Sequence, residues 1–136
     1  MTTVVFPPSW SSLKHPHVRL NLLLELAELA DPVQTARWLT SDPKGPVRGF
    51  HETVHFFFDD HVFNPEEIGW SLFDESEVES VTALVEDLDV ILNAKKDCDD
   101  RFALSHPNWS LVESAARRAL DRLQRYGIPF WDEANA

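Results

Sequence analysis

The sequence has few residues of the kinds that several common protein classes require. There is one cysteine, Cys98, so no internal disulfide can form, which is compatible with a reducing compartment. The four glycines form no Gly-rich phosphate-binding loop. A G-x-S-x-G nucleophile elbow and paired C-x-x-C motifs are also missing. Catalysis by these routes therefore has no support in the sequence.

Basic residues are also scarce. Lys and Arg number 12 against 23 Asp and Glu, which gives a formal net charge of −11. Residues 59–100 carry 14 acidic side chains and only two lysines, Lys95 and Lys96. Phosphate backbones and anionic membrane surfaces are bound by clustered Lys and Arg, so this charge argues against both as partners. It permits a basic protein partner.

No apolar run is long enough to cross a membrane. The most apolar stretch, 20–30, contains Asn21, Glu25 and Glu28 and is about half the ~20 residues that a span needs. The first twelve residues have no basic segment followed by an apolar one, as a secretory signal would. We therefore expect a cytoplasmic protein.

The patterns that are present predict a single all-α domain over 1–136, a helical-bundle-like fold of about four to five helices with irregular loops. This domain includes an N-terminal arm (1–13) and a C-terminal tail (127–136). At 50–59 a strand is the alternative, although Phe56, Phe57 and Phe58 break the alternation that a strand requires. A loop is expected at 41–49. The predicted helices cover 16–30, 32–40, 50–59, 74–93 and a last segment that begins near 105–107 and ends at Gly127.

The helix expected at 74–93 has the clearest signals. Asp74 can cap it, and Glu77 three residues later completes a capping-box arrangement. Its apolar stripe and that of the last helix predict a shared core. We expect Val85, Leu88, Val112 and Leu120 to be buried there.

The segment from His51 to His55 reads H-E-T-V-H and matches H-E-x-x-H. On a helix this spacing allows two imidazoles to bind one Zn²⁺, with Glu52 as general base in a hydrolase. A third ligand would be needed, and no second motif selects one. We therefore interpret the match as coincidence and expect no catalytic residue, metal ligand or cofactor. The alternative is a zinc site made by His51 and His55 with Glu52 as the catalytic base.

Asp59 and Asp60 follow three phenylalanines at the end of a predicted helix, where the helix dipole disfavours negative charge. Arg101, Arg117 or Arg118 could compensate them. An internal salt-bridge network and a partner-binding site are both open interpretations, and under the second we expect one of these acids to be buried and paired. Six acids are candidate partner-binding residues: Asp59, Asp60, Glu75, Glu79, Asp97 and Asp99.

Several short landmarks give the stretch 26–120 a resemblance to a family of small acidic bacterial proteins of unknown function. They are Asp31-Pro32, Phe58-Asp59-Asp60, Ile68-Gly69 with Leu72, Glu77 at a helix start, and Pro107-x-Trp109 before an Ala- and Leu-rich helix. The resemblance implies no activity. In that pattern the position of His55 is familiar and that of His51 is not.

Three functions remain open at this point. The first is a non-enzymatic acidic protein-binding module, most concretely an immunity-type protein that neutralises a basic bacterial toxin, because charge complementarity accelerates association. The second is a small zinc-dependent hydrolase that uses His51, Glu52 and His55. The third is an acidic bacterial domain whose charge serves solubility alone.

Overall fold

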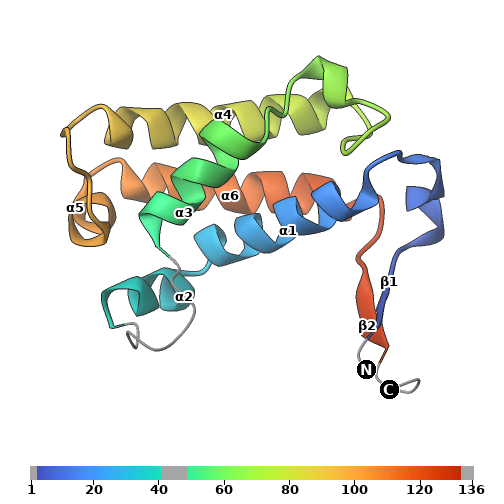
Figure 1. The fold of residues 1–136 in the computed structure, drawn as a ribbon, viewed down its shortest axis with the longest axis horizontal. Helices are drawn as coiled ribbons and strands as arrows, with labels where there is room; N and C mark the ends of the chain where they lie inside the picture. The colour runs from blue at the N-terminus through green and yellow to red at the C-terminus, as the bar shows by residue number, and fades with distance from the viewer. Residues whose placement is uncertain (1–2, 41–48, 133–136) are drawn as a thin grey trace.

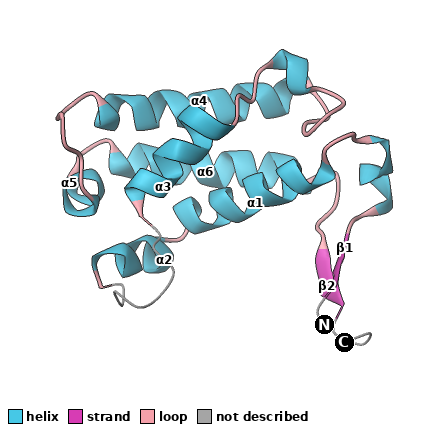
Figure 2. Cartoon of the chain, viewed as in Figure 1, coloured by secondary structure: helices cyan, strands magenta, loops and turns pink. Residues whose placement is uncertain are grey.

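The computed structural model describes residues 3–40 and 49–132, and the loop predicted at 41–49 lies almost wholly outside them. The described chain is mostly helical with one two-stranded sheet, which confirms the predicted all-α class (Figure 2). Within these residues no helix is both long and apolar enough to cross a membrane. The elements follow in the order β1 (Thr3–Val5), η1 (Pro8–Ser12), α1 (Pro16–Ala30), α2 (Pro32–Ala36), η2 (Arg37–Leu39), α3 (Phe50–Val54), η3 (His55–Asp60), η4 (Pro65–Glu67), α4 (Glu75–Leu92), α5 (Asp100–Ser105), α6 (Trp109–Gln124) and β2 (Phe130–Asp132).

Three long helices form the body of the molecule. Helix α6 packs against both α1 and α4, and α3 with η3 crosses this layer diagonally (Figure 1). Each long helix presents an apolar stripe to the others, so the core lies between them. Leu88 and Val112 are fully buried, as predicted. Val85 and Leu120 are only partly buried, because they stand at the edges of their stripes.

The start of α4 confirms the predicted cap. The Oδ1 atom of Asp74 accepts a hydrogen bond from the backbone N–H of Glu77 at 3.0 Å. The reciprocal bond of a capping box is displaced by one residue, since Glu77 Oε1 accepts from the N–H of Phe73 at 2.7 Å. This displacement leaves the Glu77 carboxylate directed into the protein interior.

Glu77 meets Arg19 there in an ion pair that the sequence did not reveal. Both side chains are at most 1% exposed, and the guanidinium donates two bonds, of 2.8 Å to Oε1 and 2.6 Å to Oε2. Arg19 also donates to the carbonyl oxygens of Ser71 and Leu123. Its guanidinium lies 4.6 Å from the ring centroid of Phe73. The pair therefore joins α1, the start of α4 and the end of α6.

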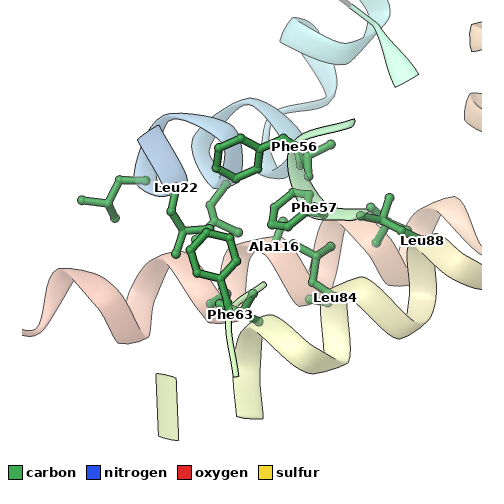
Figure 3. Packing of buried hydrophobic residues seen from close by; sticks show 14 of the residues in the cluster. Leu22, Phe56, Phe57, Phe63, Leu84, Leu88 and Ala116 are labelled. Atoms are coloured by element: carbon green, nitrogen blue, oxygen red, sulfur yellow. The ribbon is translucent and has the colours of Figure 1, made fainter. Parts of the chain in front are cut away.

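The helix predicted at 50–59 is present, and the strand alternative is wrong. Its second half, η3, is a π-helix, in which the N–H of His61 reaches back to the carbonyl oxygen of Phe56. The wider turn lets two adjacent phenylalanines, Phe56 and Phe57, both point inward. Their ring centroids lie 4.9 Å apart, and with Phe63 they fill the space between the long helices (Figure 3).

Two features between α4 and α6 differ from the prediction. The short helix α5 was not predicted, because its six residues include one buried side chain, Ala103, and so show no periodicity. Helix α6 begins at Trp109 with Asn108 as its N-cap, rather than near 105–107 as predicted. The Asn108 side chain makes no capping hydrogen bond and instead donates to the carbonyl oxygen of Asp87 in α4.

The predicted arm and tail pair with each other. Strands β1 and β2 form an antiparallel ribbon at one end of the molecule (Figure 1). Trp10 in the arm is buried, whereas Trp131 in the tail is 54% exposed. Gly127 starts the tail with φ of +102°, a conformation that favours glycine.

Tyr126, just before this glycine, provides a testable link to α4. Its hydroxyl donates to Asp74 Oδ2 at 2.5 Å, which lowers the pKa of Asp74 from its ordinary value of 3.8 and raises the pKa of Tyr126 above 10.0. A lowered carboxyl pKa stabilises the fold at pH values above the pKa of the unfolded state. That contribution is lost as the pH falls through the pKa of the folded state. A raised tyrosine pKa stabilises the fold at pH values below the pKa of the unfolded state. That contribution is lost as the pH rises through the pKa of the folded state.

Tyr126→Phe should therefore lower the free energy of unfolding at pH 7 by about 1 kcal/mol, the net value of one hydrogen bond. Thermal melts from pH 2 to 8 on both proteins measure this. The difference in Tm should shrink as the pH falls below 3.8 through the lowered pKa of Asp74 in the folded state. An equal difference at pH 2 and pH 7 would show that the hydroxyl stabilises the fold without acting on the Asp74 carboxylate.

Candidate functional site

The H-E-T-V-H segment lies on α3 and enters η3. His51 Nε2 and His55 Nε2 face each other at 3.0 Å, and the two rings meet edge to face. One turn further on, Asp59 Oδ2 lies 2.5 Å from His55 Nδ1. The three side chains therefore form a row along one face of the helix, as the i, i+4 spacing predicts. Glu52, the base in the hydrolase alternative, is exposed beside this row.

The hydrolase alternative needs a third protein ligand. Over 3–40 and 49–132, no group of three or more His, Cys, Asp or Glu side chains is arranged to hold a metal ion. His51 does line a hollow of about 370 Å³ together with Asp97, Cys98 and Asp99. The Cys98 thiol donates a hydrogen bond there to the carbonyl oxygen of Ile91, near the end of α4, at 3.2 Å.

Asp59 and Asp60 lie at the end of a helix, as the sequence predicts. Both are exposed in the chain alone, so the expectation that a partner buries and pairs one of them stays a prediction. Asp59 meets a histidine of its own helix. Arg117, one of the arginines that could have compensated these acids, donates instead to the carbonyl oxygen of Ala30 at 3.1 Å. The C-terminal end of α1 receives this positive charge, as the helix dipole favours.

The other candidate acids are separated along α4. Glu75 and Glu79 are exposed in its first turns, on the side opposite the buried stripe. Asp97 and Asp99 are exposed beyond its other end, and Asp99 caps α5 by accepting from the N–H of Phe102 at 2.8 Å. Beyond Glu79 the helix continues for thirteen residues to Leu92, about 20 Å, before the chain reaches Asp97 and Asp99. The six predicted acids therefore do not form one site.

A different group of acids does come together, along α1. Two adjoining hollows share Asp60 and His61, and their volumes are about 500 and 380 Å³. We call them together the acidic groove. Its carboxylates come from α1, from the last residue of η3 and from η4: Glu25, Glu28, Asp60, Glu66 and Glu67. None of the described residues that line it is Lys or Arg. Phe56 lines the first hollow, and the exposed Val62 lines the second.

Sequence reasoning missed Glu25 and Glu28 as functional candidates because they precede the acidic segment 59–100. One signal was available for Glu25. It lies three residues after Leu22 and four before Leu29, so its position in the helical period is on the apolar side of α1. The structure buries it there, at the wall of the groove. An acid on an apolar helix face is an informative exception.

Comparison with known proteins places the chain in a family. A family model described as a domain of unknown function (DUF7945) matches residues 13–127. The chain belongs to this family. No curated protein and no solved structure matches it significantly.

The DUF7945 region contains the three long helices, the row of His51, His55 and Asp59, and every residue of the acidic groove. Both strands of the ribbon lie outside it. The family match agrees with the expectation that the chain belongs to a family of unknown function. The individual landmarks that suggested it remain predictions.

Proposed function

We propose that this protein is a non-enzymatic module that binds a basic protein partner, most concretely a bacterial toxin domain that it neutralises. The observation that carries the proposal is the acidic groove, where carboxylates from two distant segments line adjoining hollows and no described lining residue is basic. A Lys- or Arg-bearing segment of the partner fits such a surface. The family description gives no activity, so the argument depends on this surface and on the net charge of −11.

Charge and apolar contacts have different roles in this proposal. The exposed acids Glu75 and Glu79 of α4 lie outside the groove and contribute to the long-range field that accelerates encounter. The groove itself holds the partner, with Phe56 and Val62 as apolar contacts between the carboxylates. Opposite charges that lose water on binding act mainly on the dissociation rate, whereas rim charges act on the association rate.

The test is a pair of matched charge removals. Asp60→Asn removes a carboxylate shared by both hollows, and Asp121→Asn removes one from the exposed side of α6. Affinity capture from the native host, followed by binding kinetics on the captured protein, compares the variants with the wild type. We expect Asp60→Asn to weaken binding about tenfold or more, because a desolvated charge pair is broken. Asp121→Asn should leave it nearly unchanged.

The salt dependence of the association rate is an independent test on the same complex. Exposed charges are screened beyond about 8 Å at physiological ionic strength, so association should slow between low and physiological salt. Neutralising Glu75 and Glu79 should slow association modestly and leave dissociation unchanged. A partner whose association rate ignores salt in this range would contradict the electrostatic argument. Rescue of cell growth when the chain is produced together with the captured basic protein would identify that protein as a toxin.

A further inference from the structure

The two imidazoles of the H-E-T-V-H segment are arranged as a pair of ligands. Their Nε2 atoms lie 3.0 Å apart, one helical turn from each other, and both side chains reach solvent. We propose that His51 and His55 bind one divalent transition-metal ion, Cu²⁺ or Ni²⁺ in preference to Zn²⁺, with Asp59 as the residue that positions His55. Solvent molecules complete the coordination.

The distance between the two Nε2 atoms is compatible with one shared ion. Two imidazole nitrogens at about 2.0–2.1 Å from one metal lie about 3.3 Å apart at a tetrahedral angle and about 2.9 Å apart at a right angle. The observed 3.0 Å is the length of an N–H···N hydrogen bond and lies within about 0.3 Å of both values, so small side-chain rotations allow either geometry. Cu²⁺ has the highest affinity for nitrogen ligands in the Irving–Williams order, and protein-bound Zn²⁺ uses three or four protein ligands where this site offers two.

Asp59 fixes which nitrogen of His55 is available. A carboxylate only accepts hydrogen bonds, so His55 Nδ1, at 2.5 Å from Asp59 Oδ2, carries the proton. In the neutral ring the lone pair is then on Nε2, which faces His51. A carboxylate that orients a ligating histidine through its other nitrogen is the usual support of a metal ligand. Without metal, the N–H of His51 Nε2 donates to His55 Nε2. When the ion binds, His51 takes its other neutral tautomer, with the proton on Nδ1, so that the Nε2 lone pair can coordinate the ion.

The surroundings suit an exchangeable ion. The His55 and Asp59 side chains are 46% and 57% exposed, so the ion and its water ligands have access. The net charge of −11 raises the local concentration of cations. With two protein ligands on one helix, the ion is not part of the fold, and the chain should fold equally well in a chelator. The site is separate from the acidic groove, so it does not depend on the proposed partner.

The experiment is calorimetric titration of the untagged full-length chain with Cu²⁺, Ni²⁺ and Zn²⁺ salts alone, in a buffer that does not coordinate metals. We expect one ion per chain with affinity in the order Cu²⁺, Ni²⁺, Zn²⁺. Asp59→Asn should weaken binding about 10–100-fold, and His51→Ala or His55→Ala at least as much. His17→Ala, an exposed histidine of α1, is the matched control and should bind as the wild type does.

Thermal melts give a second readout that does not depend on the calorimetric signal. A saturating ion should raise the Tm of the wild type and of His17→Ala, and leave that of His51→Ala and His55→Ala unchanged, because binding to the native state alone stabilises it. Absence of one-to-one binding below about 0.1 mM would overturn the proposal. Binding that survives both His51→Ala and His55→Ala would also overturn it, since the ligands would then lie elsewhere.

Discussion

Arg19→Ala should lower the free energy of unfolding by about 3–5 kcal/mol, the largest effect expected of any single change in this protein. The substitution leaves the Glu77 carboxylate buried without its cation, and it removes the donors that reach the carbonyl oxygens of Ser71 and Leu123. Since domains are stable by only about 5–15 kcal/mol, such a loss could unfold most of the population near physiological temperature. Urea denaturation of both proteins measures it.

Two further variants separate a broken pair from a general packing defect. Arg19→Met with Glu77→Leu replaces both ions by apolar groups, and it should cost less than Arg19→Ala because no charge is left unpaired. Arg118→Ala removes an exposed arginine from α6 and should change stability by about 0.5 kcal/mol or less. If Arg19→Ala cost no more than Arg118→Ala, the buried pair would have no role in stability.

Leu88→Ala should cost about 2–5 kcal/mol, because it removes a fully buried side chain and leaves a cavity. Leu88 faces the core from α4, near Phe57 of η3 and Ala116 of α6 (Figure 3). These neighbours belong to packed helices, so the space cannot close easily. Chemical denaturation measures the loss.

The same helix supplies the control for Leu88. Val90, two residues later, is 53% exposed, and Val90→Ala should cost less than about 0.5 kcal/mol. Val85→Ala at the edge of the stripe should fall between the two. A loss below about 1 kcal/mol for Leu88→Ala would be incompatible with a rigid core at this position.

The helices that could be predicted from the sequence are those whose signals are local. The periodic stripes and caps of 16–30 and 74–93 correspond closely to α1 and α4, and Asp74 caps as expected. Helix α5 escaped prediction because a six-residue helix with one buried side chain has almost no period to detect. The π-helix at 55–60 was also beyond local reasoning, since it results from packing two adjacent phenylalanines inward.

The candidate site was harder to predict because it depends on contacts across the chain. The spacing of His51 and His55 correctly indicated that their side chains face each other, which is a property of any helix. The acidic groove combines Glu25 and Glu28 with residues 60–67, and no local pattern links these segments. For the same reason a single arginine in α1 gave no sign that it is buried.

The Arg19–Glu77 pair also has a consequence for the order of folding. Its guanidinium contacts residues that are 52, 58 and 104 positions away along the chain, so three large loops must close before the pair is complete. Contacts of this range are expected to form after the helices have met, when most of the transition-state structure is already in place. The pair should then contribute little to the folding rate and mainly slow unfolding, so that it determines how long a folded molecule persists.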